Sequence, residues 1–390
     1  MGIFLQKCVF PMSKLRAVLK SIMMLIALSI VSTGAVILSG GTAMAESGDD
    51  SKHAIEYIYS ANQAADNLNV YKIDSSTGEL KSVPGSPYKT GFYPVSVTVS
   101  PDGHFVYVAN QGSNSVTVFH VNADNGVLDP IPGSPFTAGQ YPDAVEMSPD
   151  GRFLYVANED ANLVKLFSVD HKTGVMRDTG HTVKTGEHPI SITLSPQGRF
   201  AYVSNFYGNS VNAYQVNQQT GELTPVGKAA ATDDNPIYIA ITPDTRFAYV
   251  ANYGSTTVSA FRINEQTGEL TEVKGSPFLA GAKPYSVTVD PKNHYVYACN
   301  WLGHDVTAFR IAKSTGALVE IKGSPYSSEL FPYAVVVDHT DRYAYVANNA
   351  SGTISAYTIE AASGALQEIK GSPYADSAGP YSLIISHYQE

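Results

Sequence analysis

The stretch SPDGRFLYVAN, residues 148–158, contains a proline–aspartate–glycine turn followed by apolar residues at alternate positions. Alternation of apolar and polar side chains predicts a half-buried β-strand. Proline presets φ in such a turn, and glycine accepts the positive φ that other residues avoid. With the apolar segment that precedes it, this stretch therefore predicts two antiparallel strands joined by a tight turn.

Close copies of this stretch recur at a fixed spacing along the chain. A proline leads into the first strand of each copy, and successive prolines are 47 or 48 residues apart, at Pro94, Pro142, Pro189, Pro236, Pro284, Pro332 and Pro380. An asparagine ends the second strand of each copy, at Asn62, Asn110, Asn158, Asn205, Asn252, Asn300 and Asn348. A period near 50 residues with several short strands per copy is typical of β-propeller blades.

One complete copy contains four expected strands, at residues 95–100, 105–110, 115–121 and 127–131. No sustained helical period follows residue 45, so the fold class is all-β. The chain begins its first copy at a second strand, and its last segment, 380–386, is a first strand without a partner. Pairing the two removes exposed strand edges. The sequence thus predicts a seven-bladed β-propeller of four-stranded blades, with the first blade closed by the carboxyl-terminal strand.

The amino-terminal 45 residues have the pattern of a secretory signal peptide. Basic residues Lys14, Arg16 and Lys20 precede an apolar run at 22–38, and Ala43-Met44-Ala45 resembles a cleavage site. We expect an exported protein, periplasmic or extracellular, without a stable membrane anchor. Residues 46–56 are expected to be a flexible segment, and 57–390 to form the propeller.

Composition excludes several classes of function. Loss of residues 1–45 changes the formal net charge from −10 to −14, so nucleic acid is not an expected partner. Cys299 is the only cysteine after residue 45, which excludes an intrachain disulfide and a zinc site built on several cysteines. It occupies a strand position that holds alanine or serine in the other copies, so we expect it to pack in the core. No motif for a phosphate loop, a zinc peptidase or haem is present, and no cofactor or metal is expected.

Residues that recur in most copies are expected to be structural. The turn aspartates Asp102, Asp150 and Asp244 are expected to hydrogen-bond their own backbone rather than a metal. The asparagines that end second strands are expected to satisfy nearby backbone groups. The Gly-Ser-Pro-aromatic segments are expected to connect an outer strand to the next blade, with the aromatic ring between blades.

Function is expected where the copies differ. In a four-stranded blade, the loop between strands two and three shares one face with the connection to the next blade. The residue after each second-strand asparagine lies on this face, at Gln63, Gln111, Glu159, Phe206, Tyr253, Trp301 and Asn349. The residue after each leading proline lies near the channel mouth, at Val95, Asp143, Ile190, Ile237, Tyr285, Tyr333 and Tyr381. Each set contains three consecutive aromatic residues.

These positions predict an aromatic-rich recess that binds a ligand. The predicted ligand-binding residues are Phe206, Tyr207, Tyr253, Trp301, Tyr285, Tyr333, Glu159 and His188, and the residues expected to flank them include Asp143, Asp160 and His304. Flat aromatic surfaces suit sugars, peptides and the apolar anchors of partner proteins. The alternative is that the rings fill the central channel and that the histidines are solvated loop residues.

The repeated SPDGRFLYVAN, VTVF, TGEL and GSPF segments resemble those of the YVTN-repeat propellers and the related lactonase-like seven-bladed propellers, which include 6-phosphogluconolactonase and the fungal muconate cycloisomerases. The resemblance covers residues 57–386. It implies lactonase-like chemistry, but lactonases of this kind carry a Gly-Pro-Arg-His motif at a first strand, and no leading proline here is followed by Arg-His. The Asn-Glu pair that follows a second strand in the family occurs once, at Asn158-Glu159. No catalytic residue is therefore transferred from the resemblance.

Three functions are consistent with these observations. The sequence favours an exported binding or interaction protein that uses the aromatic recess to bind a protein, peptide or carbohydrate. The second is a lactonase-like hydrolase or isomerase acting on a lactone or organic acid. The third is a structural surface-layer module, which predicts self-association.

Overall fold

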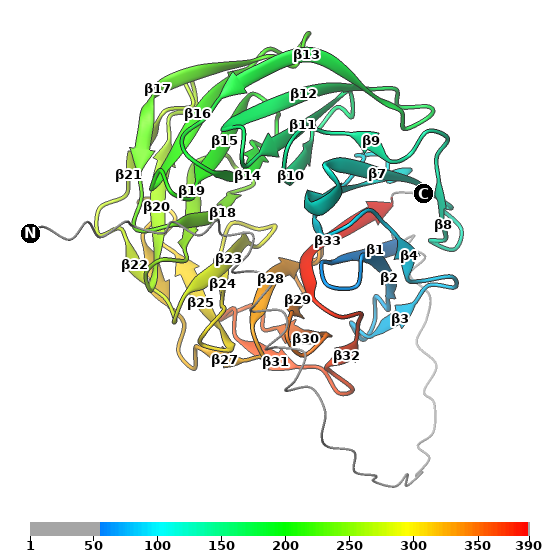
Figure 1. Ribbon diagram of the computed structural model, residues 1–390. Helices are drawn as coiled ribbons and strands as arrows, with labels where there is room; N and C mark the ends of the chain where they lie inside the picture. Colours follow the sequence, from blue (N-terminus) through cyan, green and yellow to red (C-terminus); the bar gives the residue numbers. More distant parts are fainter. Residues whose placement is uncertain (1–54, 389–390) are drawn as a thin grey trace, which may run out of the picture. The chain divides into compact units, whose positions relative to one another are not determined.

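The computed structural model describes residues 55–388, and these residues form a ring of seven antiparallel sheets (Figure 1). The predicted signal peptide lies outside the described residues. Blade 1 contains β1–β4 and β33, and blades 2–7 follow in chain order. Within residues 55–388, no helix is long and apolar enough to cross a membrane.

The first strand of each blade lines the central channel. These strands are β33 (Pro380–Tyr388), β5 (Pro94–Val99), β10 (Pro142–Met147), β14 (Pro189–Leu194), β18 (Pro236–Ile241), β23 (Pro284–Val289) and β28 (Pro332–Val337). Each contacts the first strands of the two neighbouring blades, and the contacts of β33 with β5 and β28 close the ring.

The second strand of each blade is buried along its length, because the third strand and both neighbouring blades cover it. These strands are β1 (Ile55–Asn62), β6 (Phe105–Asn110), β11 (Phe153–Asn158), β15 (Phe200–Asn205), β19 (Phe247–Asn252), β24 (Tyr295–Asn300) and β29 (Tyr343–Asn348). The third strands are β2 (Asn67–Ile73), β7 (Ser115–Val121), β12 (Leu163–Val169), β16 (Ser210–Val216), β20 (Thr257–Ile263), β25 (Asp305–Ile311) and β30 (Thr353–Ile359). One short 3-10 turn, η1 (Gln111–Ser113), follows β6.

The fourth, outermost strand of the blade is continuous in two blades and is divided into two short strands in the other five. Blades 3 and 4 use nine-residue strands, β13 (Met176–Lys184) and β17 (Leu223–Ala231). The other blades use two short strands each: β3 (Leu80–Ser82) and β4 (Tyr88–Lys89), β8 (Leu128–Pro130) and β9 (Phe136–Thr137), β21 (Leu270–Glu272) and β22 (Phe278–Leu279), β26 (Leu318–Glu320) and β27 (Tyr326–Ser327), β31 (Leu366–Glu368) and β32 (Tyr374–Ala375).

The Gly-Ser-Pro segments are more than connections. Each divided outer position has a cis Ser-Pro peptide between its two short strands, as at Ser134-Pro135. The Ser134 hydroxyl accepts a hydrogen bond from the Val118 amide at 2.9 Å, and Phe136 then pairs with Val116 of the third strand. The segment therefore returns to the sheet, which the sequence pattern did not indicate.

The first blade closes as predicted. β33 pairs antiparallel with β1, with Tyr57 opposite Ser386 and Ser60 opposite Leu383. Blades are also joined by the second-strand tyrosines, whose hydroxyls donate to a glycine carbonyl in the next blade's outer turn. Tyr345 of blade 7 donates in this way to Gly78 of blade 1 at 2.9 Å, so a buried hydrogen bond also spans the closure.

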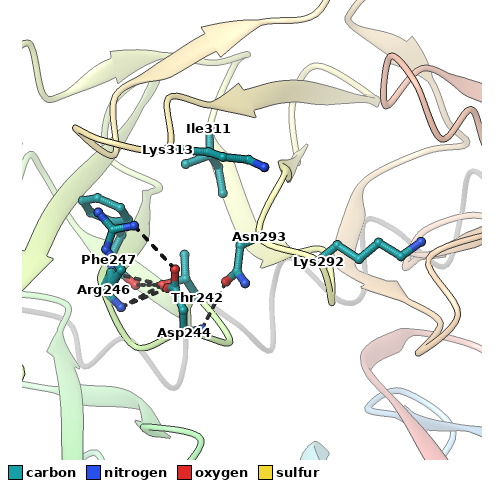
Figure 2. Close-up of a pocket in the computed structure, with 8 residues that line it drawn as sticks. All are labelled: Thr242, Asp244, Arg246, Phe247, Lys292, Asn293, Ile311 and Lys313. Atoms are coloured by element: carbon teal, nitrogen blue, oxygen red, sulfur yellow. Dashed lines mark hydrogen bonds and ion pairs between the residues drawn. The ribbon is translucent and has the colours of Figure 1, made fainter.

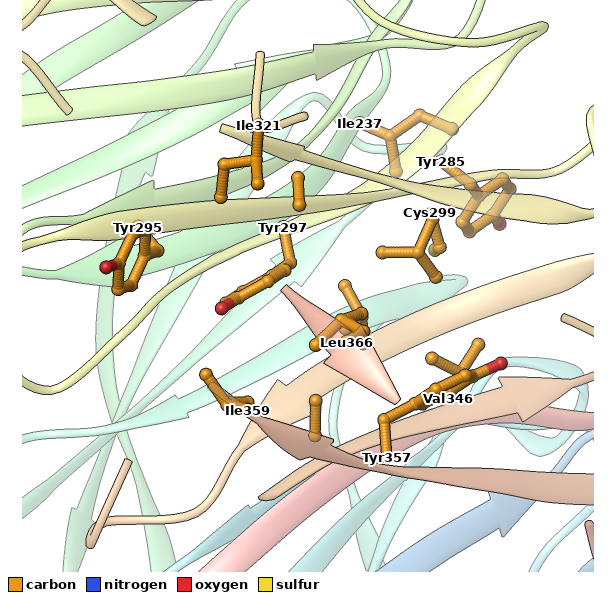
Figure 3. Packing of buried hydrophobic residues seen from close by; sticks show 14 residues of the cluster. Ile237, Tyr285, Tyr295, Tyr297, Cys299, Ile321, Val346, Tyr357, Ile359 and Leu366 are labelled. Carbon is orange, nitrogen blue, oxygen red and sulfur yellow. The ribbon is translucent and has the colours of Figure 1, made fainter. Parts of the chain in front are cut away.

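Apolar side chains between adjacent sheets form the core. Cys299 lies in this interior beside Tyr285, between blades 6 and 7 (Figure 3), and it is fully buried. Burial raises the pKa of its thiol to about 12. Packing is therefore the role of Cys299, as the sequence pattern predicts.

Candidate functional site

The site is built on the face that carries the loops between strands two and three, here called the loop face. On this face, the amide after each second-strand asparagine donates to the carbonyl of the residue before the same blade's leading proline. Examples are Glu159 to Tyr141 at 2.9 Å and Phe206 to His188 at 2.8 Å. These bonds hold the residue after each second-strand asparagine beside the residue before each leading proline.

The residues before the prolines share an uncommon backbone conformation. Tyr141, His188 and Phe331 have φ of 51°, 54° and 56°, in the left-handed region. A side chain from the preceding blade holds each: Asn162 Oδ1 accepts from the His188 amide at 2.8 Å. His304 does the same for Phe331, since its Nδ1 accepts from the Phe331 amide at 3.0 Å. His304 therefore positions the backbone, and its Nδ1 carries no proton in this arrangement.

Aromatic side chains form an arc over blades 4 to 7. The Phe206 and Tyr253 ring centroids are 6.2 Å apart, Tyr253 lies 5.7 Å from Trp301, and Trp301 stacks on Phe331 at 4.7 Å. Lys283 Nζ lies over the Tyr253 ring, 4.5 Å from its centroid. These rings are half-buried, so part of each ring stays accessible to solvent.

A second group of rings fills the channel mouth. The Tyr285 centroid is 4.2 Å from that of Tyr333 and 5.8 Å from that of Tyr381, and the Tyr285 hydroxyl donates to the Tyr381 hydroxyl. Tyr285 is only 8 % exposed. Burial and then the charge of Asp143 raise the pKa of Tyr381 well above its usual value. Tyr285 thus offers little surface to a ligand and acts mainly as a plug.

Tyr238 belongs to the same group, although it is not among the predicted site residues. Its ring centroid lies 6.1 Å from that of Tyr285. Each first strand is irregular just after its leading proline, and in blade 5 this irregularity extends from Pro236 to Ile239. The longer bulge leaves Tyr238 outside the regular pairing, and an aromatic residue two positions after the proline was its only signal.

Polar side chains form a connected line across blades 2 to 4. Gln111 Nε2 donates to Glu159 Oε2 at 3.0 Å, and Glu159 Oε1 lies 3.0 Å from His188 Nδ1. The Tyr207 ring meets the His188 ring edge-on, with centroids 4.4 Å apart. The side chains of His188 and Glu159 are 28 % and 12 % exposed. Glu159 therefore orients a partly open imidazole whose Nε2 has no hydrogen-bond partner among residues 55–388.

Contacts connect all eight predicted site residues. From Glu159 they run through His188, Tyr207 and Phe206 to Tyr253. From Tyr253 they branch to Trp301 and, through Tyr285, to Tyr333. Their role in ligand binding stays a prediction. Of the flanking residues, Asp143 is buried at the channel mouth and Asp160 is exposed.

Two small hollows lie on the opposite face, here called the turn face because it carries the turns between strands one and two. One, of about 160 Å³, lies between blades 5 and 6 (Figure 2) and is lined by Thr242, Asp244, Arg246, Phe247, Lys292, Asn293, Ile311 and Lys313. The other, of about 180 Å³, occupies the equivalent place between blades 3 and 4. Their recurrence marks them as products of blade repetition, so the polar and aromatic loop face is the stronger candidate.

Comparison with known families and structures agrees with this architecture. The family model described as lactonase, 7-bladed beta-propeller matches residues 88–191, 184–289 and 276–380. No curated protein matches the chain in sequence.

Solved structures share the fold at low sequence identity. A candidate 6-phosphogluconolactonase from Bacteroides fragilis is 19% identical, with a TM-score of 0.76 over 87% of this chain and 100% of its own. A candidate 6-phosphogluconolactonase from Bacteroides uniformis is 17% identical, with a TM-score of 0.75 over 85% of this chain and 99% of its own. The periplasmic gluconolactonase of Pseudomonas aeruginosa is 19% identical, with a TM-score of 0.72 over 85% and 99%. At these identities the likeness shows the fold alone.

Proposed function

Because the chain belongs to the seven-bladed β-propeller lactonase family, we propose that it is a lactone hydrolase whose reaction takes place on the loop face at His188. The observation that carries this proposal is the Glu159–His188 pair, 3.0 Å apart, with the second imidazole nitrogen left open. A carboxylate that fixes the orientation of a histidine is a common arrangement for a general base.

The pair also relates to the motif that the sequence lacks. In the family's Gly-Pro-Arg-His motif the histidine follows the proline, whereas here His188 directly precedes Pro189. Glu159 belongs to the one Asn-Glu pair that follows a second strand, and it comes from the preceding blade. The chain therefore supplies a histidine and a glutamate at the loop face from a different register of the repeat.

Each group has a defined part in the proposed reaction. His188 Nε2 removes a proton from water as the water oxygen bonds to the lactone carbonyl carbon, and Glu159 stabilises the imidazolium that results. The Tyr207 hydroxyl, on the ring that contacts His188, donates a hydrogen bond to the developing oxyanion. The ring C–O bond then breaks, and the imidazolium returns its proton to the leaving oxygen. The product is a hydroxy acid.

Two observations favour a lactone without a phosphate group as substrate. The acidic residues Glu159, Asp143 and Asp160 lie at the site and disfavour a phosphate group, and the ammonium of Lys283 lies against the Tyr253 ring. The predicted signal peptide supports export from the cytosol, and sugar phosphates are not expected outside the cytosol. The gluconolactonase of Pseudomonas aeruginosa, which shares the fold, is also named as periplasmic. We therefore propose an exported enzyme for unphosphorylated sugar or organic-acid lactones.

The test is pH-stat hydrolysis of a panel of sugar and organic-acid lactones, with the spontaneous rate subtracted. Loss of a general base lowers kcat by about 10²- to 10⁴-fold, which is the expectation for His188→Gln. Glu159→Gln is expected to lower kcat less, since the histidine remains. His181→Gln is the matched control, because His181 of the outer strand β13 pairs with Glu222, which directly precedes β17. No turnover above the blank, or equal rates for wild type and His188→Gln, would contradict the proposal.

Exposed apolar residues on the loop face favour ligand binding as a second function. Phe92, Leu302 and Leu330 are each about half exposed or more, and the backbone of each is hydrogen-bonded within the loop-face connections. Isolated exposed apolar residues are ordinary, but several on one face mark a surface for recognition. The test is a binding screen with exported proteins, peptides and sugars. Trp301→Ala and Tyr253→Ala should each weaken capture, and unchanged affinity in both variants would exclude the aromatic arc as the binding surface.

A further inference from the structure

The turn face departs from the repeat at blades 6 and 7. In blade 2, the Ser100 hydroxyl accepts a hydrogen bond from the Phe105 amide at 2.9 Å and so closes the turn. Serine or threonine has this role in blades 3 to 5. Blades 6 and 7 have Asp290 and Asp338 at this position instead. A carboxylate therefore replaces the hydroxyl, although a hydroxyl is enough to close the turn in the other blades.

Asp290 is completely buried, and the turn uses mainly one of its oxygens. Oδ1 accepts from the amides of His294 and Tyr295, both at 2.6 Å. Oδ2 accepts one longer bond, 3.2 Å, from the Lys292 amide. The side chain of His294 is half-buried beside this carboxylate, at a turn position that holds arginine in most other blades. Blade 6 thus places a carboxylate and an imidazole together.

Asp341 of blade 7 completes the cluster. It occupies the fourth turn position, which is glycine in blades 2 to 4, and it is 2 % exposed. Its Oδ2 lies 3.3 Å from Lys292 Nζ, whereas its Oδ1 is buried and has no hydrogen-bond partner. Potential ligand atoms of Asp290, His294 and Asp341 all lie within 4.8 Å of one another. An unsatisfied buried carboxylate oxygen is costly and requires an explanation.

Protein cations only partly balance the charge of this cluster. The Lys292 side chain is 54 % exposed, and it extends away from Thr242 and Asp244 of the neighbouring hollow (Figure 2). Burial, followed by the charge of Asp290, raises the pKa of Asp341. A half-exposed ammonium can move into water, but both carboxylates are fixed by the fold. The arrangement therefore suits a cation that replaces the lysine.

We propose that Asp290, His294 and Asp341 bind one divalent transition-metal ion, such as Zn²⁺, that joins blade 6 to blade 7 on the turn face. One imidazole nitrogen with carboxylate oxygens is a ligand set for such ions, whereas Ca²⁺ and Mg²⁺ prefer oxygen alone. Water completes the coordination. No sequence motif indicates this metal site, because its ligands come from turns in two different blades.

Isothermal titration with Zn²⁺ tests the site, on protein purified without a polyhistidine tag. Wild type is expected to bind one ion per chain, and its thermal midpoint should rise on binding. Asp341→Asn and His294→Gln should each weaken binding at least tenfold and remove that thermal shift. Titration with Mg²⁺ should give much weaker binding.

His181→Gln is the matched control, because the His181–Glu222 pair is an exposed histidine–carboxylate pair away from this cluster. It should leave Zn²⁺ affinity unchanged. His294→Gln changes a half-buried side chain and so guards against a folding defect in Asp341→Asn. Absence of a saturable site in wild type, or wild-type affinity in both cluster variants, would overturn the proposal.

Discussion

Glu146 lies on β10 in the channel wall, and its burial makes the stability of the propeller depend on pH. Its Oε1 accepts a hydrogen bond from the Leu194 amide of β14 at 3.3 Å. Burial raises the pKa of Glu146 to about 7 from the ordinary 4.5, and the bond from Leu194 lowers it by a smaller amount. Because the folded-state pKa is the higher one, protonation favours folding. The stability contributed by the protonated group is complete below pH 4.5 and is lost as pH rises to 7.

Glu146→Gln removes this titration and keeps an oxygen for the Leu194 amide. A shift from 4.5 to about 7 at 1.36 kcal/mol per pKa unit corresponds to about 3 kcal/mol as an upper bound. The variant should therefore match wild type near pH 4.5 and exceed it by up to about 3 kcal/mol at pH 8.

Urea unfolding of both proteins at several values between pH 4.5 and 8 measures this difference. Burial also raises the pKa of Asp376, to about 6, but that group titrates in both proteins and cancels in the comparison. A stability difference that stays constant across the pH range would refute the reasoning. A variant less stable than wild type at pH 8 would do the same.

Three further predictions concern single side chains. Tyr345→Phe removes the buried hydrogen bond to Gly78 across the closure of the ring. It should lower the free energy of unfolding, measured by urea titration, by about 1–2 kcal/mol. An unchanged free energy of unfolding would mean that the bond contributes nothing to stability. Tyr207→Phe should lower kcat for lactone hydrolysis by about 10-fold or more with little change in thermal midpoint, since it removes one oxyanion donor from a partly exposed ring. Cys299 should react with a thiol reagent only after unfolding, because its side chain is buried and the pKa of its thiol is raised to about 12. Rapid labelling of the native protein would contradict its placement in the core.

The sequence predicts which residues lie on the loop face, but it does not predict which of their side chains contact one another. Copy-to-copy alignment placed Glu159 and His188 on one face, and the backbone bonds confirm that placement. The line from Gln111 through Glu159 to His188 crosses three blades, and nothing local in the sequence indicates which of these side chains meet. His304 was predicted to flank the ligand-binding residues. In the structure its Nδ1 accepts a hydrogen bond from the Phe331 amide and so positions that backbone.

The sequence by itself determined the seven-bladed ring and its closure. Strand alternation, turn chemistry and a 47- or 48-residue period are regularities that each copy carries, so their sum specifies the architecture without knowledge of any single contact. Only the tertiary structure decided that Tyr285 fills the channel mouth, that Tyr238 joins it, and that Asp290, His294 and Asp341 come together. These outcomes depend on a longer bulge in one strand and on the approach of turns from adjacent blades. The approach of the turns is set by packing between blades, which no single repeat encodes.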